Sequence, residues 1–362
     1  MKPPFRADHV GSLLRPTALA QIRARHKRGE LSAAQLRAAE DAAIRAVVAR
    51  QESIGLRSIT DGELRRDYWH IDFLRQLDGV TIADSPGLKF GGTEEQPPMA
   101  TVTGRVDCTR PIMADDYAFL KSVTSETAKY TIPSPSMLHM RGGRKAVSTA
   151  VYPEMGAFWD DVGAAYRRAI GYFAARGCSY LQLDDVSFSY LCDAKFRSGC
   201  QANGDDPATL PRTYAKVINA ALRDRPLGMS VTMHTCRGNF KSSWVAEGGY
   251  EPVAEAMFST DVDGFFMEFD SERAGTFEPL RLLPKGKRVV LGLVTTKQGT
   301  IESSDELKRR IEAASRYVPL ENLCLSPQCG FSSTHHGNAV SEDEQWRKLD
   351  LIVKVAGEVW GA

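Results

Sequence analysis

The chain has 362 residues, of which 43% are hydrophobic and 25% charged, a composition typical of a globular protein rather than a disordered, collagenous or coiled-coil one. Its 46 Lys and Arg residues nearly balance its 45 Asp and Glu residues, giving a formal net charge of +1. This balance argues against a nucleic acid or an anionic membrane as the main partner, so we expect a small-molecule ligand.

The start of the chain, MKPPFRADHV, lacks the apolar core of a signal peptide. No stretch approaches the run of about 18 apolar residues that a membrane-spanning helix needs, and we expect a cytoplasmic protein. The seven cysteines are an odd number in a chain too large to need disulfides, so reduced thiols are expected.

Strand-like runs alternate with helical patterns along the chain. A first strand is expected near residues 7–10, and a helix follows the capping-box pattern of Ser32 and Gln35 and stops at Gly55. The other strands are predicted at residues 57–60, 129–133, 179–183, 229–233, 264–267, 288–291 and 322–325. Further helices are predicted at residues 115–125, 158–176, 214–223, 303–317 and 342–359, the fourth of these with a second capping box, Ser303 to Glu306.

Eight strands that alternate with helices require parallel pairing through helical crossovers, and eight is the number that closes a sheet into a barrel. The predicted fold is therefore α/β, a single (β/α)8 TIM barrel that forms one catalytic domain over residues 1–362. An open doubly wound sheet is the alternative. Two surplus segments, residues 66–111 and 185–211, are predicted to be insertions after the second and fourth strands.

The reacting groups of such barrels lie at the carboxyl ends of the strands, where this sequence is polar. His234 and Cys236 are two apart on one predicted strand, so their side chains point to the same side with Cα atoms roughly 6.6 Å apart. Imidazole and thiolate are ligands that Zn²⁺ favours. Glu268 on the next strand and Cys329 beyond the last one complete a candidate ligand set.

The charge of this set points to a reaction. Two thiolates and one carboxylate outweigh the charge of Zn²⁺ and leave the site with net negative charge, so the metal would polarise a carbonyl or a water molecule poorly. A substrate thiol would still lose its proton on coordination, and its sulfur would remain nucleophilic. We therefore expect zinc-activated alkylation of a thiol.

The sequence resembles the catalytic half of cobalamin-independent methionine synthase, a zinc barrel that methylates homocysteine from methyltetrahydrofolate. The resemblance rests on motifs in a fixed order: Gly11-Ser12, Asp61-Gly62-Glu63, Leu183-Asp184-Asp185, His234-Thr235-Cys236, Glu268 and Ser326-Pro327-Gln328-Cys329-Gly330. It implies that the zinc ligands are His234, Cys236, Glu268 and Cys329. It also implies that the amino acid part of homocysteine is held by Ser12, Glu63 and Asp184.

Two departures from the family pattern concern the methyl donor. The long enzymes have a second, N-terminal barrel, for which 362 residues leave no room, and a histidine loop after the seventh strand, where this chain reads GLVTTK at residues 292–297. Related short barrels include the epoxyalkane:coenzyme M transferases, so alkylation of another thiol is the alternative function. His335 and His336 follow the eighth strand and could protonate a leaving group. The alternative, which is at least as well supported, is that they are an exposed pair in a loop.

The rival functions are a zinc amidohydrolase and a structural or zinc-sensing barrel. The first fits poorly, because only His234 is a histidine at a proposed ligand position. The second leaves Ser12, Glu63 and Asp184 unexplained. The sequence does not decide whether the donor is a small molecule or a separate methyl-carrying protein, or whether the chain forms homo-oligomers.

Overall fold

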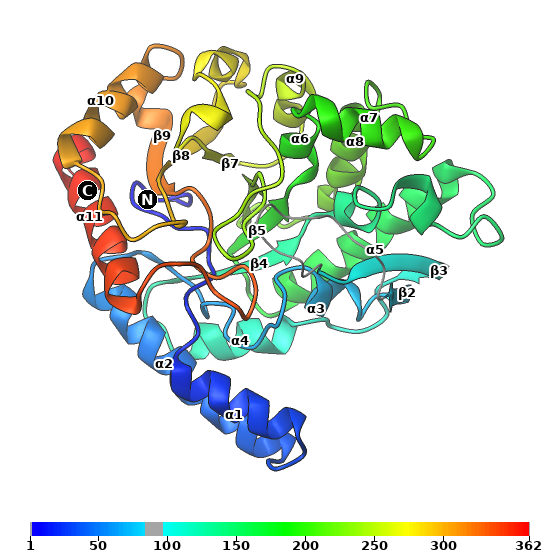
Figure 1. Cartoon of the computed structure of the whole chain (residues 1–362), viewed down its shortest axis with the longest axis horizontal. Helices are drawn as coiled ribbons and strands as arrows, with labels where there is room; N and C mark the ends of the chain where they lie inside the picture. Colours follow the sequence, from blue (N-terminus) through cyan, green and yellow to red (C-terminus); the bar gives the residue numbers. More distant parts are fainter. Residues whose placement is uncertain (1, 84–96, 362) are drawn as a thin grey trace.

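The computed structural model describes residues 2–83 and 97–361. Its centre is a curled, seven-stranded parallel sheet whose spatial order follows the chain (Figure 1). The strands, in that order, are β1 (Ser58–Ile59), β4 (Thr127–Pro133), β5 (Tyr180–Asp185), β6 (Ser230–Thr235), β7 (Gly264–Glu268), β8 (Arg288–Val294) and β9 (Leu323–Pro327). All carboxyl ends therefore meet at one edge of the sheet, as the predicted barrel requires.

Helices surround this sheet in Figure 1. The longer ones are α1 (Thr17–Lys27), α2 (Ala33–Ser53), α4 (Ala114–Ser122), α5 (Met155–Ala175), α8 (Leu210–Leu222), α10 (Ser304–Ser315) and α11 (Glu342–Trp360), and α9 (Ala254–Phe258) is short. Phe158, Val162 and Tyr166 of α5 recur at helical spacing and are buried. A Cβ added at Gly163 would lie 3.0 Å from the Cβ of Ala220, so the close packing of α5 on α8 depends on this glycine.

The predicted strand at residues 7–10 is reduced to a single parallel bridge, between Ala7 and Leu325 of β9. The Asp8 side chain explains this difference. Its carboxylate accepts hydrogen bonds from the backbone N–H groups of Phe5 at 3.1 Å and His9 at 2.8 Å, which are therefore not available to a ladder. A closed barrel of eight strands stays a prediction, and the described residues form a curled sheet of seven.

Both predicted insertions contain secondary structure. In the described part of residues 66–111, α3 (Ile71–Leu74) precedes an antiparallel pair, β2 (Asp78–Ala83) and β3 (Met99–Asp107). Residues 185–211 hold α6 (Ser187–Tyr190) and α7 (Ala194–Ala202). Since the insertions follow β1 and β5, both leave the sheet at its carboxyl edge, next to the expected site.

One capping prediction is correct and one is wrong. Ser32 Oγ accepts from the backbone N–H of Gln35, and the Gln35 side chain accepts in return, so the capping box of α2 is present. Ser303 precedes α10 but its side chain makes no capping hydrogen bond. The expected partner, Glu306, accepts from Arg309 at 3.1 Å instead, one turn further along. Among the described helices, none is both long and apolar enough to span a membrane.

Candidate metal and substrate site

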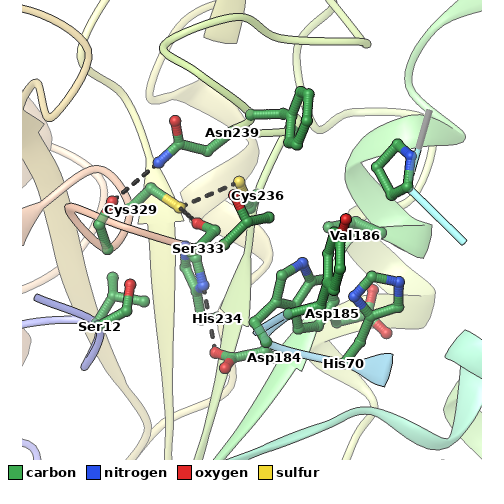
Figure 2. A pocket seen from close by; sticks show the side chains of 18 of the residues that line it. Ser12, His70, Asp184, Asp185, Val186, His234, Cys236, Asn239, Cys329 and Ser333 are labelled. Carbon is green, nitrogen blue, oxygen red and sulfur yellow. Dashed lines mark hydrogen bonds and ion pairs between the residues drawn. The ribbon is translucent and has the colours of Figure 1, made fainter. Parts of the chain in front are cut away.

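Three predicted ligands come together at the carboxyl edge of the sheet. His234 and Cys236 lie at the end of β6, and Cys329 follows β9. Their ligand atoms all lie within 4.8 Å of one another, and the two Sγ atoms are 3.4 Å apart (Figure 2). Two strands, β7 and β8, separate β6 from β9 in the sheet, so only the curl of the sheet brings Cys329 to this cluster.

The cluster fits a zinc ion by the chemistry of its donors and by its spacing. Two sulfurs bound tetrahedrally at about 2.3 Å from one zinc ion would be about 3.8 Å apart, close to the spacing of Cys236 and Cys329. One histidine and two cysteines also leave the fourth tetrahedral position open, which is typical of catalytic rather than structural zinc sites.

The three groups influence one another's protonation. The hydrogen bond to Cys329, together with burial, holds the pKa of Cys236 well above its usual range, and the same bond lowers the pKa of Cys329. Burial alone would lower the pKa of His234, but hydrogen bonds with Asp184 and Cys329 raise it to about 10. A divalent cation that binds to these three side chains would therefore displace the protons that they share.

Asp184 fixes the orientation of the His234 ring. His234 Nδ1 lies 3.4 Å from Asp184 Oδ1, which also accepts a 2.7 Å hydrogen bond from the side chain of Gln182. A carboxylate behind a metal-binding histidine holds the ring and makes it a stronger ligand. Asp184 therefore has a second candidate role besides the predicted contact with substrate.

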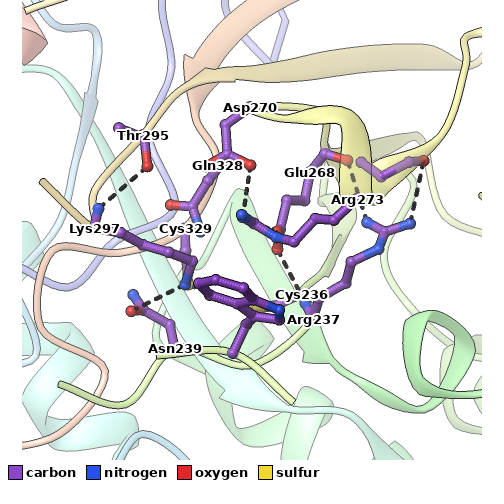
Figure 3. A network of polar contacts seen from close by, with 12 residues as sticks. Cys236, Arg237, Asn239, Glu268, Asp270, Arg273, Thr295, Lys297, Gln328 and Cys329 are labelled. Atoms are coloured by element: carbon purple, nitrogen blue, oxygen red, sulfur yellow. Dashed lines mark hydrogen bonds and ion pairs between the residues drawn. The ribbon is translucent and has the colours of Figure 1, made fainter. Parts of the chain in front are cut away.

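The fourth predicted ligand, Glu268, lies outside this three-residue cluster. Its Oε1 accepts from Arg273 Nε at 3.0 Å, and its Oε2 accepts from the backbone N–H of Arg237 at 3.0 Å (Figure 3). Burial would raise the pKa of Glu268, but the charges of Lys297, Arg237 and Arg273 lower it, so the group is held as a carboxylate. Its charge also contributes to the raised pKa of Cys236. Its role as a ligand stays a prediction, and it would require exchange of the Arg273 contact.

The three predicted substrate residues line the same pocket as the cysteine and histidine cluster. Glu63 is the most informative of them. Its Oε1 accepts from Thr131 Oγ1 at 2.8 Å, while its buried Oε2 has no hydrogen-bond partner among the described residues. Burial raises the pKa of Glu63 to about 7, with a contribution from the nearby Asp184 charge. An unpartnered buried carboxylate oxygen suits a ligand cation.

Ser12 is placed by a close contact with the last motif. A Cβ added at Gly330 would lie 1.9 Å from Ser12 Oγ, so a side chain there would displace the Ser12 hydroxyl. Ser12 Oγ also accepts from the backbone N–H of Ser332 at 3.4 Å. Gly330 ends the last of the motifs that resemble the synthase family. The close approach of its segment to Ser12 is a steric reason for a glycine at this position.

His335 and His336 lie beside the pocket rather than among its lining residues. Their ring centroids are 3.8 Å apart, and His335 is exposed. His336 Nδ1 is 3.0 Å from the hydroxyl of Thr334, which does line the pocket. A role in proton transfer stays a prediction.

Several lining residues were not anticipated from the sequence, among them His70, Arg141 and Asn239. Asn239 donates to the backbone carbonyl of Gly330 at 2.9 Å and so braces the segment after Cys329. His70 and Arg141 lie in connecting segments, where no periodicity or strand-end rule points to a site. A search for polar residues at strand ends could not have found them.

The family model described as "Cobalamin-independent synthase, Catalytic domain" matches residues 5–358. Two proteins of Bacillus subtilis, YxjH and YxjG, both described as uncharacterized, are 46% and 47% identical to the chain and are matched over 99% of it and 96% of their own lengths. A 5-methyltetrahydropteroyltriglutamate–homocysteine methyltransferase of Thermotoga petrophila is 22% identical, over 98% of the chain and 45% of its own length.

Two solved structures that are similar to the chain are described as methionine synthases as well. The structure of a putative vitamin-B12-independent methionine synthase from Listeria monocytogenes has a TM-score of 0.79 at 39% identity and covers all of both chains. A B12-independent methionine synthase from a Shewanella species, at 18% identity over 98% of this chain and 97% of its own, has a TM-score of 0.74 and supports the fold alone. The chain therefore belongs to the family of the cobalamin-independent methionine synthase catalytic domain.

Proposed function

We propose that this chain is a zinc-dependent thiol methyltransferase that transfers a methyl group from a methylfolate-type donor to homocysteine and forms methionine. The observation that carries this proposal is one pocket that holds both a His234, Cys236 and Cys329 cluster and the unpartnered carboxylate oxygen of Glu63. The same proposal treats residues 1–362 as one catalytic barrel that works in the cytoplasm.

His234, Cys236 and Cys329 would hold the zinc ion, with Glu268 as a fourth ligand when no thiol is bound. The bound ion would lower the pKa of the substrate thiol, so that the acceptor reacts as a thiolate. Asp184 keeps the His234 ring in place through the 3.4 Å contact with Nδ1.

The polar residues of the pocket would bind the rest of homocysteine. The free oxygen of Glu63 accepts from the substrate ammonium, and Asp184 adds a second negative charge on the same side. The Ser12 hydroxyl donates to the substrate carboxylate. These contacts orient the sulfur toward the donor, which is worth several kcal/mol in a two-substrate reaction.

In the transfer step, a sulfur–carbon bond forms and the nitrogen–carbon bond of the donor methyl group breaks. The thiol proton leaves the acceptor on binding, and the leaving nitrogen of the donor takes up a proton. His335 and His336, next to the pocket-lining Thr334, are our candidates to deliver that proton. Each step so written balances in atoms and charge.

The alternative function is alkylation of a sulfonated thiol such as coenzyme M. Arg141, a cation that lines the pocket, is the observation in its favour. Against it, Glu63 and Asp184 would repel a sulfonate near the cluster. A structural or sensory zinc protein remains a third candidate, and it would bind zinc but no thiol.

The test is a screen of thiols against methyl and alkyl donors on the purified chain, with the zinc content measured in the same samples. We expect about one zinc ion per chain and methylation of homocysteine. Calorimetry in buffers of different ionisation enthalpy should show that binding of homocysteine at neutral pH releases about one proton more than binding of methionine, which has no thiol. Homoserine, the oxygen analogue, is the control and should bind much more weakly. Binding of homocysteine without this additional proton release would refute activation of the thiol by zinc.

A further inference from the structure

His70 is a buried imidazole in the substrate pocket whose ring nitrogens have no hydrogen-bond partner among the described residues. It precedes α3, is 2% exposed, and lines the same pocket as Cys236 and Cys329. Leaving buried polar atoms unpaired is unfavourable, so such a group in a pocket marks a contact that a ligand completes. Trp69 packs against the imidazole, with ring centroids 4.6 Å apart, and holds it in place.

Arg141 lines the same pocket and adds a positive charge there. The side of the pocket formed by His70 and Arg141 is called the wall below. Its Nε is buried without a hydrogen-bond partner in the described part of the chain, and burial lowers the pKa of the guanidinium. The Nε of Arg237 also lacks a partner in that part of the chain, but the rest of that guanidinium donates to Tyr250 at 2.8 Å, and Arg273 pairs with Glu268 at 2.5 Å. Arg141 differs in that no hydrogen bond or ion pair from residues 2–83 and 97–361 holds its guanidinium. A partly buried cation without a counterion among the described residues is unfavourable, and a ligand anion would supply that counterion.

The two side chains are close enough to interact. Burial and then the charge of Arg141 hold the pKa of His70 well below its usual range, so the imidazole is neutral at physiological pH. A neutral imidazole offers one N–H donor and one acceptor, while a guanidinium can donate two parallel hydrogen bonds to a planar anion. Together they suit one carboxylate or phosphate group.

His70 lies away from Ser12, the residue proposed to bind the carboxylate of the acceptor. In Figure 2, Ser12 and His70 are on opposite sides of Asp184 and His234. Arg141 also lines a second cavity, with Lys195 and Phe196 from α7 among its other lining residues. A ligand that reaches Arg141 from the cluster therefore has room to continue beyond the acceptor site.

We propose that His70 and Arg141 form an anion-binding subsite for the alkyl donor, which must then carry a carboxylate or phosphate group. This inference rests on the proposed function, because it assigns the other side of the pocket to the acceptor thiol. It also excludes sulfonium and quaternary ammonium compounds as donors, since Arg141 would repel their charge at this wall.

Ligand-observed NMR titrations of the purified full chain test the subsite without any thiol present. The probes are benzoate, phenyl phosphate and phenyltrimethylammonium, which share one ring and differ in their charged group. We expect the wild-type chain to bind at least one of the two anions and to bind it more tightly than the cation. Arg141→Gln should weaken binding of that anion by about tenfold or more, and Arg141→Lys by less. The control is Arg105→Gln, which removes an exposed guanidinium that pairs with Asp161 outside the pocket.

Benzoate and phenyl phosphate also separate a carboxylate donor from a phosphorylated one. Failure of both anions to bind, tighter binding of the cation, or equal anion affinity in Arg141→Gln and the wild type would overturn the proposal. An equal loss of homocysteine affinity in Arg141→Gln would assign Arg141 to the acceptor and overturn it as well. The zinc content of each variant must match the wild type, which shows that the pocket has kept its fold.

The outcome is independent of the thiol assay. Arg141-dependent anion binding without any homocysteine methylation would reject the proposed function alone. Homocysteine methylation with anion affinity unchanged in Arg141→Gln would reject the subsite alone.

Discussion

Replacement of Glu63 by Gln tests how the pocket recognises an amino thiol. Oε2 of Glu63 is buried and has no partner among the described residues, so an incoming ammonium can use it without displacing another donor. A charge-assisted hydrogen bond of this kind contributes about 1.5–3 kcal/mol, which corresponds to a loss of roughly tenfold to a hundredfold in affinity when the charge is removed.

The pH dependence gives the second, sharper readout. A carboxyl group with a pKa of about 7 is ionised to roughly one tenth at pH 6 and roughly nine tenths at pH 8. If the ammonium binds only the ionised form, the affinity should rise roughly tenfold between these pH values, because ionisation supplies the charge that it contacts. In Glu63→Gln the rise should disappear, since an amide does not titrate in this range.

Methionine, the expected product, is the right probe because it carries the ammonium but no thiol. Its binding, measured by calorimetry, is therefore free of the proton release that a thiol would add. The control is Glu251→Gln, an exposed glutamate paired with Arg281 away from the pocket, which should leave both affinity and pH profile unchanged. Wild-type affinity in Glu63→Gln, or a pH profile that survives the substitution, would refute the assignment of Glu63 to the ammonium.

Three further predictions concern the cluster and its supports. Cys329→Ala should lose most of its zinc while the chain stays folded, as metal analysis and circular dichroism would show. Cys324 lies in a separate apolar cluster, so Cys324→Ala should keep its zinc. Loss of zinc in Cys324→Ala alone would contradict the ligand assignment. Asp184→Asn should weaken zinc binding by about tenfold to a hundredfold in chelator competition, and no change would mean that Asp184 does not support His234. Gly330→Ala should weaken homocysteine binding, because the new Cβ, 1.9 Å from the present position of Ser12 Oγ, would displace that hydroxyl, and unchanged affinity in calorimetry would contradict the assignment of Ser12 to the substrate carboxylate.

The parts of the fold that could be predicted from sequence are those with local causes. The run of β-branched and apolar residues in β8 predicts a buried strand by itself, and the Ser32 capping box marks the start of α2 without help from the rest of the chain. The strand-end rule for parallel sheets is equally general, so His234 and Cys236 could be assigned to one site before any coordinates. Cys329 could be assigned to the same site because it comes just after the last predicted strand.

Other features depended on competition between alternative hydrogen-bond partners of one side chain. Asp8 binds two backbone N–H groups and leaves only a bridge where a strand was expected, and Glu306 pairs with Arg309 rather than with the end of its helix. Glu268 has the right residue type and position for a ligand, yet in the structure its carboxylate is bound by Arg273. Hydrogen bonds of similar strength compete in each case, and spacing alone does not decide which one forms.

What the sequence by itself determined is the alternating pattern of strands and helices and the cluster of ligand types at the strand ends. Only the tertiary structure decided which other side chains face that cluster. His70 and Arg141 come from segments between strands that have no periodicity, and the folded chain brings them to the pocket of the cluster. That the described part of the chain offers these two side chains so few partners could not be predicted, because the absence of a partner is a property of everything packed around a group and not of its neighbours in sequence.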